Sequence, residues 1–298
     1  MVSAPVLFGT MGTLDPNYEE LRVLDAELDA IGTPHHIERF DGGHQWPPVE
    51  LSTRAVEWLD LQAMRRGLLA RNQPWIDSLY GAWLATAARI DAAGDGFVAA
   101  RLYRQVRADF DGLTNVTAAA TRYAALAADA KVTRAAAAEH AIGERDVQLG
   151  ETLIGYVADL KRAPSPPSVD DARKKLDLDR LRRDAARTDD STASIAARRA
   201  LERVYSHMSF YAPRVFFDER RYAHAAFVLQ IARLVKPDDG SACYSHARAL
   251  AQLGDKAKAL QALECAAAAK VVDAATIERD ALLAPLRSEP RYEALVRR

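Results

Sequence analysis

The chain has 298 residues, which is enough for two domains, and 49% of them are hydrophobic by a broad count, so a sizeable core can form. Its formal net charge of −1 argues against a basic surface for nucleic acid or for a membrane. Two cysteines are too few for a disulfide framework or a four-ligand zinc site, and no apolar run approaches the length of a membrane span.

The N-terminal part of the chain, residues 1–70, alternates between strand and helix patterns. Residues 6–8 form a short apolar run typical of a buried parallel strand, which is expected to extend to Thr10, and residues 37–40 are predicted to form the second strand. Between them, apolar side chains recur at helical spacing, and the sequence from Gly32 to Pro34 predicts the end of that helix. A further helix is expected to begin near Pro48.

From residue 74 onward the sequence predicts helices and no strand. Alanine is abundant there, and Gly and Pro separate segments of helical length. Residues 163–168, rich in Pro and Ser, are predicted to form an extended linker. Residues 173–190 mix Arg and Asp, which favours a solvated helix or a poorly ordered connector over a binding patch.

A 34-residue repeat occupies the last third of the chain. Residues 206–239 and 240–273 share residue types at fixed offsets, and Gly254 and Asp255 make the predicted turn of the second unit. The matching positions are Tyr222, Ala225, Leu229, Ala232 and Pro237 in one unit and Lys256, Ala259, Leu263, Ala266 and Val271 in the other. This spacing resembles tetratricopeptide (TPR) repeats, in which small residues let two helices pack closely and large ones fill the gap.

The resemblance to TPR is incomplete in two places. Cys243 stands where an aromatic residue is usual, and Pro213 falls within the first helix of the first unit. Residues 80–113 fit the same frame once, and residues 274–298 resemble the capping helices that such arrays need. Cys243 and Cys265 lie at packing positions of the repeat, which favours two buried, inert thiols.

An acidic residue and a histidine follow the two predicted strands. Asp15 lies just past the first strand in a Gly-Thr-Leu-Asp-Pro-Asn-Tyr segment, and His44 follows the second in Phe-Asp-Gly-Gly-His-Gln-Trp-Pro. Because the carboxyl ends of neighbouring parallel strands lie side by side, we expect the two side chains to meet. A carboxylate bonded to one ring nitrogen would hold the imidazole in the orientation that a general base needs.

These two segments resemble the C-terminal end of an α/β-hydrolase, of the serine esterase, dienelactone hydrolase and prolyl-peptidase-like branch. The resemblance covers residues 1–70, about a quarter of the chain. It implies that Asp15 and His44 are the acid and the histidine of a Ser-His-Asp triad, which follows the order Ser, acid, His along the chain. The alternative interpretations are a helix N-cap or turn role for Asp15 and a structural or surface role for His44.

The nucleophile of such a triad is missing from this sequence. No Gly-x-Ser-x-Gly pentapeptide occurs, and the oxyanion hole that accompanies it is therefore not expected. Ser3 precedes the first strand and Ser52 falls within a predicted helix, so neither occupies a nucleophile elbow. We expect the pair to be a vestigial or incomplete triad with little hydrolytic activity of its own.

Other candidate sites are weaker. His35, His36 and His44 do not present three imidazoles on one face, and neither a metal nor another cofactor is expected. The aromatic residues between positions 205 and 222 are expected in the core of the first repeat. Alternatively, some of them line a groove for a peptide, with Tyr211, Phe217 and Tyr222 as the candidate binding residues.

The first strand poses a structural problem, since a lone parallel pair is not a stable sheet. Its outer edge is expected either to be exposed or to be the seam of a homodimer, and the helical domain is a candidate to cover the exposed apolar surface. A third interpretation, which the position of Met1 just before this strand favours, is that the natural or ancestral reading frame is longer.

The sequence thus predicts a mainly α protein. It comprises a small N-terminal α/β (βαβα) segment at 1–70, a helical segment with one diverged TPR-like unit at 74–162, a connector at 163–190, and TPR-like repeats with a cap at 191–298. The predicted function is that of a hydrolase remnant, not catalytic alone, whose TPR-like domain binds a protein or peptide. The alternative is a serine esterase or peptidase that is active when an N-terminal half completes it. Neither nucleic acid nor a membrane is expected as a partner, and a cytoplasmic location is expected unless an N-terminal signal is missing.

Overall fold

The computed structural model describes residues 5–189 and 191–297. This part of the chain is mainly helical, as the sequence predicts, and its only strands are two short ones near the start. The chain divides into two compact units, Met1–Arg145 and Asp146–Arg298, and the boundary lies within helix α6 (Ala130–Arg162). Each unit buries its own set of apolar side chains.

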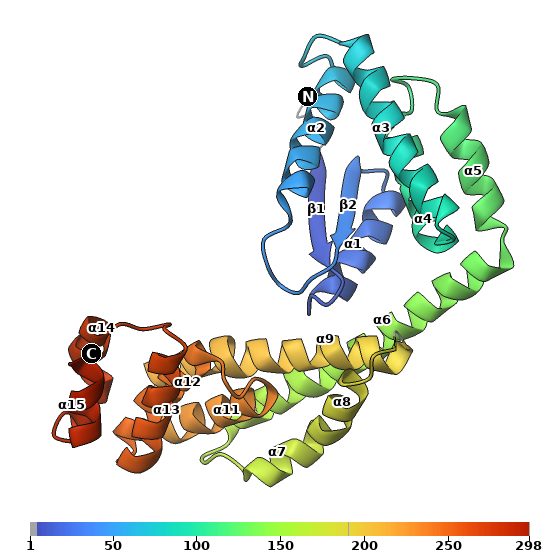
Figure 1. Cartoon of the computed structure of the whole chain (residues 1–298). Coiled ribbons are helices and arrows are strands. Elements are labelled where there is room, and N and C mark those ends of the chain that lie inside the picture. Colours follow the sequence, from blue (N-terminus) through green and yellow to red (C-terminus); the bar gives the residue numbers. More distant parts are fainter. Residues whose placement is uncertain (1–4, 190, 298) are drawn as a thin grey trace. The chain divides into compact units, whose positions relative to one another are not determined.

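A two-stranded parallel sheet lies at the start of the first unit (Figure 1). Strands β1 (Leu7–Gly12) and β2 (His35–Phe40) are in register, with Leu7 opposite His35. Helix α1 (Tyr18–Ala30) connects them. Because the two strands run in the same direction, their carboxyl ends lie at the same edge of the sheet, where the following loops meet.

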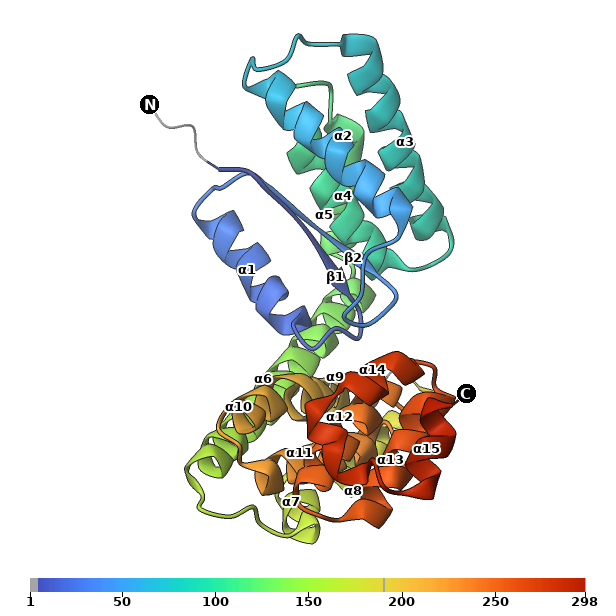
Figure 2. The ribbon, with the colours of Figure 1, turned by 90° about the vertical axis from the view of Figure 1, so that its left-hand side faces the viewer.

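Helices pack on both faces of this sheet. Figure 2 shows the sheet nearly edge-on, with α1 on one side and the following helices on the other. On the α1 side, Met11, Tyr18 and Ile37 form a small buried cluster. On the opposite side, Phe8 lies 5.9 Å from the ring of the fully buried Trp58. The helices after the sheet in this unit are α2 (Val49–Arg65), α3 (Gln73–Ala92), α4 (Gly96–Phe110), α5 (Thr117–Ala127) and the first part of α6.

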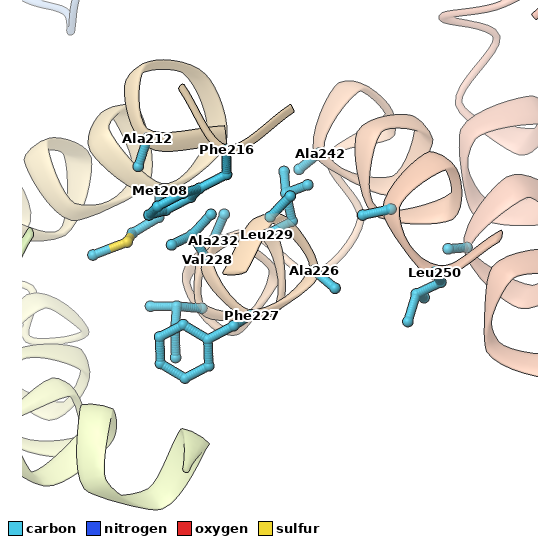
Figure 3. Packing of buried hydrophobic residues seen from close by; sticks show 14 of the residues in the cluster. Met208, Ala212, Phe216, Ala226, Phe227, Val228, Leu229, Ala232, Ala242 and Leu250 are labelled. Atoms are coloured by element: carbon cyan, nitrogen blue, oxygen red, sulfur yellow. The ribbon is translucent and has the colours of Figure 1, made fainter. Parts of the chain in front are cut away.

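The second unit is helical throughout its described residues. Its core includes Met208, Phe216, Val228 and Leu229, which lie between neighbouring helices in Figure 3. The segment expected as a linker or connector contains two short helices with many exposed Arg–Asp pairs. After the end of α6, the elements are α7 (Val169–Lys175), α8 (Leu178–Ala185), α9 (Thr192–Ser206), η1 (His207–Tyr211), α10 (Ala212–Asp218), α11 (Tyr222–Val235), α12 (Gly240–Gln252), α13 (Lys256–Ala268), α14 (Ala274–Arg279), η2 (Ala281–Leu286) and α15 (Pro290–Val296).

A wide turn accommodates the proline that departs from the repeat pattern. η1 is a π-helical turn between α9 and α10, and the N–H of Ala212 bonds to the carbonyl of His207, five residues back. Pro213 follows at once; it has no N–H to donate, and its ring would clash with the carbonyl of an ordinary helical turn. The wider turn makes room for that ring without ending the helix.

Two helical hairpins, one in each unit, share the same turn. Gly94 between α3 and α4 has φ of +90°, and Gly254 between α12 and α13 has φ of +77°, a conformation that glycine adopts without steric cost. The aspartate after each glycine caps the next helix: Asp95 accepts the N–H of Val98 at 3.0 Å, and Asp255 accepts an N–H in the same way. Alanines that follow these turns at equal offsets, Ala99 and Ala259, are fully buried.

The two cysteines are joined, so the prediction of two separate thiols is wrong. Cys243 in α12 and Cys265 in α13 form a disulfide, with their Cα atoms 5.9 Å apart. Each lies eleven residues from Gly254, the turn of the hairpin, so antiparallel helices place them opposite each other. The equal spacing from Gly254 is a signal in the sequence for this pairing. The prediction of two thiols considered only the number of cysteines and their packing positions.

None of the helices in the described ranges combines the length with the apolar character that a membrane span requires.

Candidate functional site

Asp15 lies in the turn that leads from β1 into α1. Its N–H donates to the Gly12 carbonyl at 3.0 Å, and its carboxylate Oδ1 accepts the N–H of Asn17 at 2.8 Å. The residue is buried, with 8% of its surface exposed. Asp15 therefore has the turn role that its sequence context predicts, and this role fixes the carboxylate at the carboxyl end of the strand.

The loop after β2 is held against the same end of β1. The N–H of Leu14 donates to the Gly42 carbonyl at 2.8 Å. A Cβ atom on Gly12 would lie only 2.5 Å from the carbonyl oxygens of Gly42 and Gly43. Glycine at position 12 permits this close approach, which brings the next residue of the loop, His44, to the end of β1.

The structure brings the Asp15 carboxylate and the His44 imidazole together. His44 Nδ1 lies 3.1 Å from Asp15 Oδ2 and 3.4 Å from Oδ1. The aspartate side chain is 11% exposed, whereas the imidazole is 71% exposed. Because a carboxylate only accepts, Nδ1 donates, and Nε2 is left as the basic nitrogen of the neutral ring. This is the arrangement of an oriented general base that is open to solvent.

No described residue provides a nucleophile for this pair. His44 Nε2 has no hydrogen-bond partner in residues 5–189 or 191–297. Ser52 is exposed on α2, and Ser3 lies outside the described residues. An oriented base without an attacking group can move a proton, but it cannot form an acyl intermediate. The catalytic role of Asp15 and His44 therefore stays a prediction.

The three clustered histidines have different carboxylate partners. His35 Nε2 lies 3.2 Å from Asp25 Oδ1 and 3.7 Å from Asp29 Oδ1, the one His/Asp group in the described residues with metal-like spacing. The guanidinium of Arg104 bonds to both of these carboxylates, so a cation already occupies the place beside them. His35, His36 and His44 thus do not converge on one site.

His36 belongs to a buried charge cluster that the sequence did not reveal. Its Nδ1 lies 2.7 Å from Asp109 Oδ2 and its Nε2 lies 3.3 Å from Glu38 Oε2. Burial by itself lowers the pKa of His36, but the two carboxylates outweigh it and raise that pKa to about 9. Trp58 donates to Asp109 at 2.6 Å, and Arg54 pairs with Glu38. The cluster joins β2 to α2 and α4, and the His36 and Asp109 side chains at its centre are almost fully buried.

The candidate peptide-binding residues separate into two groups. The rings of Phe217 and Tyr222 are in contact, with centroids 6.2 Å apart, and both are half-buried. Tyr211 is 57% exposed on η1, and its ring contacts are with His207 and Phe210. Phe210 is also exposed, at 54%, so the prediction that this aromatic group lies in the core is wrong for these two residues.

Comparisons of this chain with known protein families, with curated proteins and with solved structures give no match. The resemblances to α/β-hydrolases and to TPR repeats therefore depend on the sequence motifs and on the geometry described above.

Proposed function

We propose that the first unit carries the acid and histidine of a serine-hydrolase-like site, and that the chain acts mainly by binding a protein or peptide through its helical hairpins. The observation that supports the first part is the 3.1 Å contact between Asp15 and His44. The two residues follow adjacent parallel strands in the order acid, histidine. That order and position are those that the hydrolase resemblance implies.

In this proposal each residue has a defined chemical role. Asp15 holds the Nδ1–H tautomer of His44 and balances the charge of the imidazolium that forms when Nε2 takes a proton. The proton would come from a serine or another nucleophile of an ester or peptide hydrolase. Since residues 5–189 and 191–297 place no such group at Nε2, the chain alone is expected not to turn over substrate.

Hydrolysis of 4-nitrophenyl acetate tests this part of the proposal. Wild type and His44→Ala are expected to differ by less than about twofold, because a lone imidazole reacts slowly without a nucleophile and oxyanion donors. His140→Ala is the matched control, since His140 has a similarly exposed side chain (64%) that also faces a carboxylate. Turnover that disappears in His44→Ala and persists in His140→Ala would contradict the hypothesis that the chain alone is inactive. It would favour an active esterase or peptidase.

The binding part of the proposal is supported by the repeated hairpins and by an exposed aromatic surface. The α3–α4 and α12–α13 hairpins have the same turn and the same buried alanines, as TPR-like units would. Tyr211 and Phe210 together expose an aromatic pair beside Arg214, whose guanidinium lies 5.2 Å from the Phe210 ring. Exposed aromatic and arginine side chains are typical of recognition surfaces.

Selection of peptides from a display library on the full chain tests this binding. Peptides that bind wild type are expected to lose at least about tenfold in affinity for Tyr211→Ser, as truncation of an aromatic anchor does at other interfaces. Trp46→Ser is the matched control, because Trp46 is 93% exposed in the first unit. Failure to select any peptide, or equal binding by Tyr211→Ser, would contradict the proposal.

A further inference from the structure

A cavity of about 290 Å³ lies in the second unit, between the end of α6 and helix α7. Its walls come from the last turns of α6, from α7 and from the loop between them, residues 163–168, which the sequence predicts to be an extended linker. The apolar part of the wall includes Leu160, Pro166 and Pro167. The volume is near the lower end of the range for ligand sites, so a small molecule or a single side chain is the size of group that fits.

The loop that closes this cavity is held at both ends. Arg221 of α11 donates to the carbonyl oxygen of Ala163 at 2.7 Å. At the other end, Ser168 caps α7, because its hydroxyl accepts the N–H of Asp171 at 3.1 Å. The three prolines between these points each fix a φ angle and so restrict the backbone of the loop. The cavity is therefore preformed, and a ligand that enters it does not have to order the loop.

Tyr156 brings a hydroxyl without a partner to this cavity. The residue lines the cavity and is 5% exposed, and its hydroxyl makes no hydrogen bond within residues 5–189 and 191–297. A buried hydroxyl that stays unpaired is unfavourable for folding, and most such groups in proteins have a partner. Burial, and then the charge of Asp171, raise the pKa of Tyr156 to about 12. The group therefore keeps its proton at neutral pH, and its oxygen can accept a hydrogen bond from a ligand.

Two carboxylates and one ammonium group line the same cavity. Lys175 Nζ donates to Asp159 Oδ2 at 3.1 Å and lies 5.5 Å from the centre of the Tyr156 ring, so these two charges balance each other. Asp171 accepts the hydroxyl of Ser168 at 2.6 Å, but within the described residues it has no ion-pair partner. The lining therefore has an excess of one negative charge, on a carboxylate whose field reaches the Tyr156 hydroxyl.

We propose that this cavity binds a primary amine with an apolar body, either a free arylalkylamine or the lysine side chain of a peptide. The ammonium group donates to the Asp171 carboxylate and to the Tyr156 hydroxyl, which gives each of them the partner that the fold does not supply. The apolar body lies against Leu160, Pro166 and Pro167. A carboxylic acid of the same size meets the charge of Asp171 with its own sign, so the sign of the charge decides which ligand binds.

Ligand-observed NMR titrations of the full chain test the class of ligand. We expect saturable binding of 2-phenylethylamine with a dissociation constant below about 1 mM. We expect 3-phenylpropionate, which has a carboxylate in place of the ammonium group, to bind at least about tenfold more weakly. Nα-acetyl-lysine methylamide distinguishes the two sources, because tighter binding of this compound than of 2-phenylethylamine assigns the cavity to a peptide lysine. No saturable binding of either amine, or equal binding of the acid, would overturn the proposal.

Three variants test whether the amine binds in this cavity. Tyr156→Phe removes only the hydroxyl, and Asp171→Asn removes the charge but keeps an acceptor for Ser168. Each is expected to weaken binding of 2-phenylethylamine at least about fivefold. Asp170→Asn is the matched control, because Asp170 is also on α7 but does not line the cavity and pairs with Arg173 at 3.4 Å. Its affinity for the amine is expected to equal that of wild type.

The stability of Tyr156→Phe separates a binding role from a structural one. Because the hydroxyl has no partner in the described residues, its removal is expected to leave the urea midpoint unchanged or to raise it. Circular dichroism measures that midpoint. Unchanged affinity in Tyr156→Phe, or equal losses in Asp171→Asn and Asp170→Asn, would show that the amine does not bind at this cavity and would overturn the proposal.

Discussion

At the scale of single residues, the first unit buries charged side chains together, and removing such charges from water costs free energy of folding. His36 and Asp109 are 4% and 3% exposed, and they lie 73 residues apart in the sequence. A buried charge without a partner is strongly unfavourable, whereas a paired one that is hydrogen-bonded can be tolerated. The His36 cluster therefore ties β2 to α4 only while His36 keeps its proton.

The raised pKa of His36 predicts a specific dependence of stability on pH. The folded pKa of about 9 exceeds the unfolded value near 6.5, so the contribution is complete below pH 6.5 and is lost as the pH rises through 9. The loss is on the order of 3 kcal/mol. All four tryptophans lie in the first unit, so urea unfolding followed by their fluorescence at pH 6 and pH 9.5 measures it.

Asp109→Asn is the variant that isolates this effect from other groups that titrate near pH 9. It removes the carboxylate that raises the pKa of His36 most, but it keeps an acceptor for the Trp58 N–H. We expect the variant to be less stable at pH 6 and to lose less stability than wild type at pH 9.5. Parallel pH profiles of the two proteins would show that His36 is not protonated in the folded state.

Gly12 is the residue on which the approach of the two loops depends. Gly12→Ala puts a Cβ 2.5 Å from two backbone oxygens, which cannot move as a side chain can. We expect a loss of about 1–3 kcal/mol in unfolding free energy, the usual cost of overpacking. Gly43→Ala is the control, because nothing lies within 4 Å of its Cβ position, and a change below about 0.5 kcal/mol is expected. Tryptophan fluorescence in urea again reports the result, and equal stability of the two variants would refute the steric argument.

At the scale of elements, local signals decide where helices begin and end, and packing decides which faces they share. Gly94 and Gly254 end one helix of each hairpin, and the aspartate that follows caps the next. In the first repeat the same place is taken by Arg220, which holds φ of +55° at a cost that glycine would not have. The hairpin therefore forms even where its turn residue is unfavourable, because the buried face of α11 stabilises it.

At the scale of the whole molecule, two units with separate cores are expected to respond separately to a local change. The disulfide between Cys243 and Cys265 closes a segment of 22 residues in the second unit, and a loop of that length is worth about 3 kcal/mol in the chain-entropy description. Its removal should therefore destabilise the second unit and leave the first one unchanged.

Cys243→Ala with Cys265→Ala tests this separation. The double variant removes the disulfide without leaving a thiol, and far-UV circular dichroism in urea follows the helices of both units. We expect an earlier transition in circular dichroism and an unchanged transition in tryptophan fluorescence, since the second unit contains no tryptophan. A shift of the fluorescence transition would show that the two units unfold together.

The sequence by itself determined the order of strands and helices in residues 1–70, the mainly helical character and the glycine turns, because periodicity and turn chemistry act over a few neighbouring residues. It also placed Asp15 and His44 just after two parallel strands, which a short βαβ connection constrains. Only the tertiary structure decided that His36 pairs with Asp109 and that Phe210 and Tyr211 face solvent, whereas the equal spacing of the two cysteines from Gly254 was already a signal in the sequence that they could join. The first two outcomes depend on which distant helix packs against which face, and no local pattern carries that choice.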